Sequence, residues 1–197
     1  MKNKISIITF LMAFVVVGTV QAQIKVNPKV GFNASAVDAK VQNITAEARY
    51  GWNAGIDLRM GDGAVFFKPG LHYYNFTADL FQDVNQPGDV PMKDETTIQS
   101  LKLPVNAGIR LTGDGGLLGV NVHGGVTPSY ILGVREGATV PFVKDDLKPF
   151  TLGANLGLGI DVLFFTVEAN YEIGLTPFFN GAEGKNNVLS VSAGIKF

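Results

Sequence analysis

The chain has 197 residues, with 16 basic and 17 acidic side chains and a formal net charge of −1 at pH 7. This near balance gives no reason to expect a nucleic-acid partner, because such partners require clustered positive charge. Cysteine is absent, so neither a disulfide framework nor a cysteine-based metal site can form.

The first 22 residues have the pattern of a secretory signal peptide. Lys2 and Lys4 open it, an apolar run covers residues 5–17, and small or polar residues end at Ala22. The apolar run is shorter than the ~20 residues that a membrane-spanning helix needs, which favours a cleaved signal peptide over a membrane anchor. The remainder, residues 23–197, has the size of one domain and carries 14 basic against 17 acidic residues.

An alternation of apolar and polar residues runs through residues 23–197 and predicts eight β-strands. Successive side chains of a strand point to opposite faces, so each such strand has one apolar and one polar face. The last predicted strand, NVLSVSAGIKF, shows this pattern and ends on the aromatic Phe197. In chain order the predicted strands cover residues 24–36, 49–60, 64–76, 100–110, 118–130, 150–160, 165–173 and 187–197.

The connections between these strands alternate in length. Short turns lie at residues 61–63, 112–116 and 161–163, and long polar intervals lie at residues 37–48, 79–95, 133–146 and 176–186. Strands of about 10–13 residues suit a tilted membrane crossing, and outer-membrane barrels place short turns in the periplasm and long loops outside the cell. The predicted fold is therefore all-β: an eight-stranded antiparallel transmembrane up-and-down β-barrel in the outer membrane, with both termini on the periplasmic side.

Aromatic residues of the predicted strands fall near the two ends of the barrel. Amphipathic rings prefer the interfaces between lipid and water, and outer-membrane barrels carry such rings as girdles. We therefore predict a girdle made of Tyr50, Trp52, Tyr73, Tyr130 and Tyr171 near the outer ends of their strands and of Phe197 at the inner end.

The polar faces of the predicted strands turn towards the barrel lumen. An eight-stranded barrel is only wide enough for its own side chains, and a lone charge in such an interior is costly, so we expect a paired network. This network is either a polar plug or the lining of a narrow channel biased towards anions, because predicted lumen cations outnumber lumen anions. Its predicted members are Arg49, Asp57, Arg59, Lys68, His72, Lys102, Arg110, His123, Glu168 and Glu172, with Asp161 as a further inward acid.

The inward histidines raise the question of catalysis. His72 or His123, with Ser100 and Asp57, has the residue types of an acyl-transfer site. Such an enzyme also needs an accessible nucleophile and a cavity for the acyl chain, and neither is indicated, so we expect no enzyme activity. Two histidines several strands apart are poor evidence for a metal site, and no helix follows the Gly-Asp-Gly turn to bind phosphate. We expect no metal and no cofactor.

Two of the long connections are acidic and would face the outside of the cell. Their plainest meaning is a solvated rim, and a divalent-cation bridge to lipopolysaccharide phosphates or a docking surface for a protein are the alternatives. The acidic residues are Asp79, Asp83, Asp89, Asp94 and Glu95 in one connection and Glu136, Asp145 and Asp146 in the other.

Three segments carry a resemblance to a known family. FKPGLHYY at residues 67–74, LKLPV at residues 101–105 and GVTPSYILG at residues 125–133 resemble strand signatures of the PorT-like outer-membrane β-barrel proteins of Bacteroidota. The likeness covers essentially the whole mature chain, and the barrels of OmpX and OmpA are similar in size and plan. The resemblance implies a porin-family barrel, and a role in protein secretion for some members. The C-terminal strand resembles the signal that gram-negative barrels offer to their assembly machinery.

Prolines conflict with the strand pattern. Pro28, Pro69, Pro104 and Pro128 lie inside predicted strands, where each removes a ladder hydrogen bond and is expected only at edges or bulges. A closed barrel has no edges. We therefore predict bulges or bends at Pro69 and Pro104.

These observations favour a structural or interaction role in the cell envelope, serving protein secretion or surface assembly. The expected partners are outer-membrane lipid and lipopolysaccharide, the barrel-assembly machinery and a secretion or surface protein. One alternative is a narrow porin-like channel for small solutes. Another is a soluble lipocalin-like barrel for a small apolar ligand, which predicts apolar residues facing inwards.

Overall fold

The structure is a computed structural model that describes residues 24–38, 40–41, 44–61, 63–82, 93–112, 117–135, 147–178 and 185–197. The predicted signal peptide lies outside these residues. No helix among the described residues is long and apolar enough to cross a membrane. The strands are β1 (Ile24–Asp38), β2 (Lys40–Val41), β3 (Ile44–Met60), β4 (Val65–Gln82), β5 (Lys93–Lys102), β6 (Val105–Arg110), β7 (Leu118–Arg135), β8 (Phe150–Val162), β9 (Phe165–Gly174) and β10 (Lys185–Ile195).

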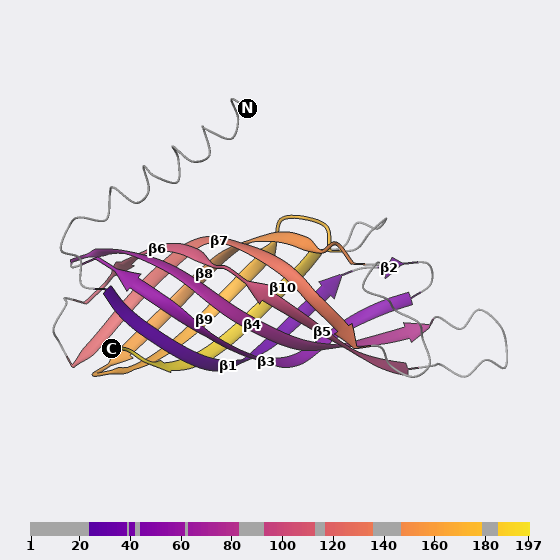
Figure 1. The fold of residues 1–197 in the computed structure, drawn as a ribbon, viewed down its shortest axis with the longest axis horizontal. Helices are drawn as coiled ribbons and strands as arrows, with labels where there is room; N and C mark the ends of the chain where they lie inside the picture. The colour runs from indigo at the N-terminus through magenta and orange to yellow at the C-terminus, as the bar shows by residue number, and fades with distance from the viewer. Residues whose placement is uncertain are drawn as a thin grey trace, which may run out of the picture.

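The strands form a closed antiparallel barrel (Figure 1). Each long strand pairs with its neighbours in the chain, and β10 pairs with β1 to complete the ring. β5 and β6 together occupy one strand position between β4 and β7, and β2 only extends β3. The ring therefore has eight strand positions, which we call staves. Beyond β10, Phe197 exchanges two backbone hydrogen bonds with Val26, at 3.1 and 2.9 Å. The predicted eight-stranded up-and-down barrel is confirmed.

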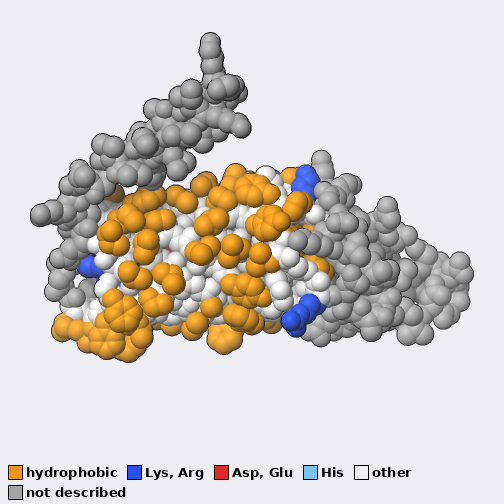
Figure 2. Space-filling view, viewed as in Figure 1, with side chains coloured by type: hydrophobic (Ala, Val, Ile, Leu, Met, Phe, Trp, Pro, Cys, Tyr) orange, Lys and Arg blue, Asp and Glu red, His pale blue; other side chains and the backbone are white. Residues whose placement is uncertain are grey.

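The wall of the barrel is apolar outside and polar inside. Figure 2 shows hydrophobic side chains over the visible wall and basic side chains only near its two ends. Phe32 of β1 and Tyr50 of β3 are 79% and 80% exposed, whereas Asn33 and Asn53, on the opposite faces of the same two strands, are buried. Closing the sheet into a barrel pairs the backbone hydrogen-bonding groups of every strand, and the alternation presents an apolar band to lipid.

The two ends of the barrel differ, and we name them by their connections. The turn end carries the short connections at residues 61–64, 111–117 and 163–164, together with the start of β1 and Phe197. At the opposite loop end, strands run further than predicted: Ile44 pairs with Gln82, and Phe81 pairs with Lys93. The prediction of loops throughout residues 37–48 and 79–95 was wrong at their margins, because backbone ladders continue where the side-chain alternation fades.

The prolines affect the ladder less than predicted. Pro104 separates β5 from β6, yet the register is the same on both sides, with His72 opposite Lys102 and Pro69 opposite Val105. The Pro104 carbonyl still accepts a hydrogen bond of 2.8 Å from the Gly70 amide. β4 continues through Pro69 without a register shift, so the bulge predicted there was wrong. The register shifts in the described ladders lie between Ala48 and Gly51 and between Gln99 and Ser100 instead.

Candidate functional site: the barrel lumen

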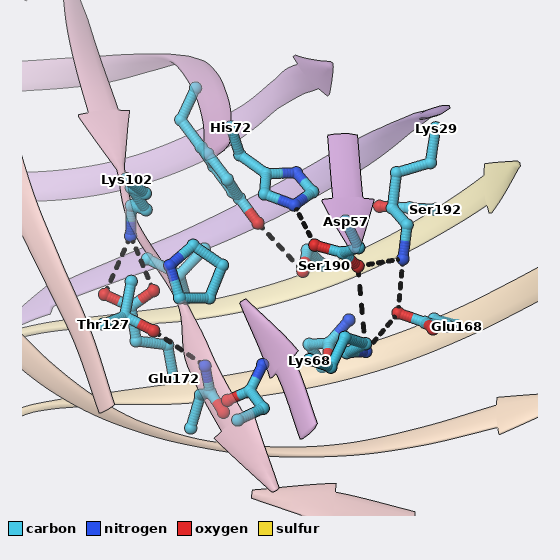
Figure 3. Close-up of a pocket in the computed structure, with 16 residues that line it drawn as sticks. Lys29, Asp57, Lys68, His72, Lys102, Thr127, Glu168, Glu172, Ser190 and Ser192 are labelled. Carbon is cyan, nitrogen blue, oxygen red and sulfur yellow. Dashed lines mark hydrogen bonds and ion pairs between the residues drawn. The ribbon is translucent and has the colours of Figure 1, made fainter. Parts of the chain in front are cut away.

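The middle of the lumen holds a cluster of buried ion pairs centred on Glu168 of β9 (Figure 3). Its carboxylate lies 2.6 Å from the Lys29 ammonium of β1, 2.8 Å from the Lys68 ammonium of β4 and 3.4 Å from the Arg59 guanidinium of β3. Asp57 of β3 shares Lys29 at 2.6 Å. All five side chains are almost completely buried. We call these residues the ionic cluster, and it ties four staves together across the barrel.

Two histidines complete the ionic cluster. His72 Nε2 lies 2.7 Å from Asp57 Oδ1, and His123 Nε2 lies 2.9 Å from the Lys68 ammonium and 2.7 Å from Asn170 Oδ1. Both rings are buried. The small inward residues make room for these rings, since a Cβ at Gly157 would overlap with the imidazole of His123.

A cation–aromatic stack fills the lumen at the turn end. The ring of Phe66 lies between two guanidinium groups, with its centroid 5.0 Å from Arg59 and 5.3 Å from Arg110. Arg59 also pairs with Asp161 at 2.5 Å, and Asp161 pairs with Lys196 at 3.1 Å. Arg110 donates hydrogen bonds to two carbonyls of the β3–β4 turn. The turn end of the lumen is therefore occupied by side chains that are bonded to the wall.

Towards the loop end, Lys102 and Glu172 form a separate pair. The Lys102 ammonium lies 2.8 Å from both carboxylate oxygens of Glu172 and 4.8 Å from the ring centroid of Tyr74. The Tyr74 hydroxyl in turn donates to Ser190 Oγ at 3.4 Å. This pair is more accessible than the ionic cluster, because the Glu172 side chain is 14% exposed.

Beyond this pair, towards the loop end, lies a group of buried apolar side chains that we call the apolar cap. None of its members is more than 5% exposed, and the rings of Phe76 and Phe178 lie 6.3 Å apart. Backbone hydrogen bonds join the connecting segments to each other and to the wall, from Lys148 to Phe178 at 3.0 Å and from Ile131 to Pro149 at 2.9 Å. The cap consists of Phe76, Ile98, Ile131, Leu147, Phe178 and Val188.

Two small cavities lie in the described part of the lumen. A cavity of about 40 Å³ lies among Lys29, Asp57, Lys102 and Glu172, and one of about 20 Å³ lies beneath Phe76 and Phe178. Such volumes hold a few water molecules at most. Together with the ion pairs around them, these small cavities indicate that the described part of the lumen is filled mainly by side chains, as expected for an eight-stranded barrel.

The structure brings together most of the predicted lumen residues. It places eight of them inside the barrel and Arg110 at its turn-end mouth, while the side chain of Arg49 lies outside the described residues. The predicted set omitted Lys29, Lys196, Tyr74 and Phe66, whereas Asp161, predicted as an inward acid, lies in the lumen beside Arg59. Each of the omitted residues lies at an inward-facing position of the apolar–polar alternation, and that position is the sequence signal that could have identified them. The eight inward residues are Asp57, Arg59, Lys68, His72, Lys102, His123, Glu168 and Glu172.

The predicted girdle residues lie on the outer wall. Tyr50, Trp52, Tyr130 and Tyr171 are exposed towards the loop end, and Phe197 is exposed at the turn end. Tyr73 packs against Trp52, with ring centroids 5.3 Å apart.

The residue types considered for acyl transfer do not assemble into a catalytic set. His72 pairs with Asp57, but the buried Ser100 hydroxyl makes no hydrogen bond within the described part of the chain, and His123 contacts Lys68 and Asn170. The described residues contain no group of three or more His, Asp or Glu side chains that could hold a metal ion.

A closed antiparallel barrel with an apolar wall and a polar, packed lumen defines an outer-membrane β-barrel. The chain belongs to the outer membrane protein β-barrel domain family, whose sequence model matches residues 21–180. The protein is thus located in the outer membrane. The polar interior and this location overturn the lipocalin-like alternative, which required an apolar interior and a soluble protein.

Solved structures of bacterial surface and outer-membrane proteins are similar to this chain at low sequence identity. Neisserial surface protein A is 10% identical, with 89% of this chain and 99% of that chain covered and a TM-score of 0.51. The attachment invasion locus protein of Yersinia pestis has the same identity and coverage, with a TM-score of 0.49. The N-terminal β-barrel domain of Pseudomonas aeruginosa OprF is 13% identical, with 90% and 100% coverage and a TM-score of 0.40. A comparison with curated protein sequences gives no match.

Proposed function

We propose that the protein is a non-conducting outer-membrane barrel that acts through contacts at its loop end, in a structural or interaction role, without enzyme activity. The observation that carries this proposal is the packed lumen, which is filled by side chains from Phe66 at the turn end to the apolar cap at the loop end. With the interior occupied, the surfaces left for function are the outer wall and the two ends.

The ion pairs of the lumen argue against a path for ions. A permeating ion must replace its hydration shell, and it can do so only by separating charges such as Lys29 and Glu168 that already satisfy each other at 2.6 Å. Breaking a buried pair costs several kcal/mol, of order 3–5. The cations of the ionic cluster therefore act as structural partners, not as an anion filter.

The loop end offers a framework for binding. Ladder pairs between β3, β4 and β5 continue past the exposed Tyr50 to Ile44, Gln82 and Lys93. In the orientation expected for outer-membrane barrels, this end faces the outside of the cell. Of the acidic connections considered above for lipopolysaccharide or protein contacts, residues 79–95 join β4 to β5 and residues 133–146 join β7 to β8. Their acidic side chains are not among those that the structure describes.

The resemblance to PorT-like proteins supports a more specific role, in which the protein takes part in protein secretion or surface assembly. The same proposal includes lipid and lipopolysaccharide around the apolar wall. It also includes recognition of β10 by the barrel-assembly machinery, because β10 is the strand that closes the ring.

Two measurements test the proposal. Purified protein in planar bilayers should give no stable current steps, in membranes where a general porin does, and a steady ohmic conductance would favour the narrow channel. In intact cells, a photoreactive amino acid at the exposed Arg135, at the loop end of β7, should yield a discrete protein adduct identified by mass spectrometry. The same amino acid at Ala64, at the turn end, is the matched control. A protein adduct from Ala64 alone would contradict the assigned contact end.

A further inference from the structure

The β8–β9 connection places large apolar side chains at the tip of a tight turn. Leu163 and Phe164 are 58% and 50% exposed, and the Phe164 ring lies 4.3 Å from the ring of the exposed Phe165. The neighbouring connection adds Leu117, whose carbonyl accepts a hydrogen bond of 3.1 Å from the Leu163 amide. We call these four residues the apolar tip, and Figure 2 shows hydrophobic side chains gathered at this corner of the turn end.

The backbone of this turn is unfavourable for the residue that it carries. Leu163 has φ of 55°, in the left-handed region where a bulky side chain is an outlier and where Gly, Asn or Asp is the usual turn residue. In the β3–β4 turn, the positive φ values of 121° and 158° fall on Gly61 and Gly63. Backbone geometry therefore does not explain a leucine at position 163. If the side chain were exposed to water, no favourable interaction would offset the cost of the positive φ.

The apolar tip continues the surface that contacts lipid. Val162 pairs with Phe165 on β9 and with Leu118 on β7, and all three side chains are exposed on the outer wall. The tip extends this wall beyond the ends of the strands without an intervening charged side chain among the described residues. Lys196, the nearest cation along the ladder, turns inwards to pair with Asp161 at 3.1 Å.

The opposite side of the ring has different chemistry. By strand order, the β3–β4 turn lies across the barrel from the β8–β9 turn. It is built from small residues, and its Gly61 and Gly63 carbonyls accept hydrogen bonds from the guanidinium of Arg110. One side of the turn end is thus suited to water and the other to hydrocarbon.

We propose that the apolar tip is a membrane-insertion site that penetrates among the phospholipid acyl chains of the adjacent leaflet. The barrel then sits deeper in the membrane at the β8–β9 side than at the β3–β4 side. The strain at Leu163 is offset because its side chain and that of Phe164 leave water for lipid, where apolar burial is favourable.

A depth measurement with a single tryptophan tests this proposal. Trp52 is the only tryptophan of the chain, so Trp52→Phe provides a background for either Phe164→Trp or the control Ala64→Trp. In phospholipid vesicles, the tryptophan introduced by Phe164→Trp should be quenched by brominated acyl chains and resist iodide. The one introduced by Ala64→Trp should show the reverse, and far-ultraviolet circular dichroism verifies that both barrels fold.

Each other outcome overturns the assignment. Equal iodide quenching at both positions would place the tip in water, and protection from both quenchers would indicate burial against protein, such as a second copy. Adding Leu163→Asn to the Phe164→Trp protein keeps a residue that accepts the positive φ but removes the apolar side chain. It should lower quenching by brominated chains at least twofold and raise iodide quenching, and unchanged quenching would mean that the turn alone holds the ring in place.

Discussion

The ionic cluster and the apolar cap fill neighbouring parts of the same lumen in opposite ways. In the cluster, Glu168 satisfies three cations at once, and the contacts join residues as far apart in sequence as Lys29 and Glu168. In the cap, side chains such as Phe76 and Ile131 are buried without polar partners, as in the core of a soluble protein. The cluster depends on the identity of each partner, and the cap depends on volume.

The difference between the cluster and the cap follows from their positions along the barrel axis. The cluster sits in the middle of the lumen, where a buried charge without a partner is costly and the charged side chains pair with one another. The cap sits near the loop end, where connecting segments contribute Leu147 and Phe178 and can bury apolar surface against inward wall residues. A barrel of this width therefore has a polar core in its middle and an apolar core at one end.

The largest effect is expected from Glu168→Gln, which keeps the shape of the side chain and removes its charge. Lys29, Lys68 and Arg59 then share only Asp57 and Asp161. Removing one partner of a buried pair leaves uncompensated charge, so the free energy of unfolding should fall by about 3–5 kcal/mol. Urea unfolding in phospholipid vesicles, followed by Trp52 fluorescence, measures the change.

Glu172→Gln is the matched control for that substitution. Glu172 has Lys102 as its ion-pair partner and its side chain is 14% exposed, whereas the Glu168 side chain is 1% exposed. Its loss should lower the free energy of unfolding by clearly less. If the two substitutions have equal effects, the ionic cluster is not the centre of the polar core.

An intermediate effect is expected from Ile131→Ala in the cap. Deleting buried methyl groups leaves a cavity, and such changes typically cost about 2–5 kcal/mol. The lower part of this range applies, because the cavity of about 20 Å³ that Ile131 lines gives its neighbours room to relax. Leu156→Ala on the outer wall is the control, and it should change the free energy of unfolding less, since lipid fills the space. A larger effect of Leu156→Ala would contradict burial in the cap.

The sequence was sufficient to predict the staves and most of the cluster, because one alternation with a period of two decides both where a strand runs and which face turns inwards. It was not sufficient for the cap. Phe76, Ile98 and Ile131 lie at inward-facing positions, but a lumen lined by polar side chains was expected, and apolar residues at such positions do not fit that expectation. Leu147 and Phe178 lie in connections, and no local pattern shows that a connection folds back into a barrel.

The alternation also could not predict which charged side chains pair with each other. Inward phase predicts that Lys68 and Glu168 share the lumen, but their contact depends on the stagger of staves that are distant along the chain. The predicted excess of lumen cations is present in the described residues, because the five cations that form ion pairs there share four carboxylates, Asp57, Asp161, Glu168 and Glu172. Lys29, Arg59, Lys68, Lys102 and Lys196 each have a carboxylate partner in the structure, and Asp161, predicted as an inward acid, serves both Arg59 and Lys196.

The smallest effect is expected at the boundary between the two cores, where Lys102 and Glu172 meet. Lys102→Met leaves the Glu172 carboxylate without its ion-pair partner, and an unsatisfied buried group costs about 1–3 kcal/mol. The lower figure applies, because the partly exposed Glu172 side chain can gain water. The double substitution Lys102→Met with Glu172→Leu removes both charges and should recover this loss, since apolar replacement of a buried pair is often neutral or stabilising. Urea unfolding of the two single variants and the double variant gives the coupling energy between the residues. Recovery would mean that the apolar core can extend downwards from the cap, whereas a further loss in the double variant would show that the polar core must begin at this level.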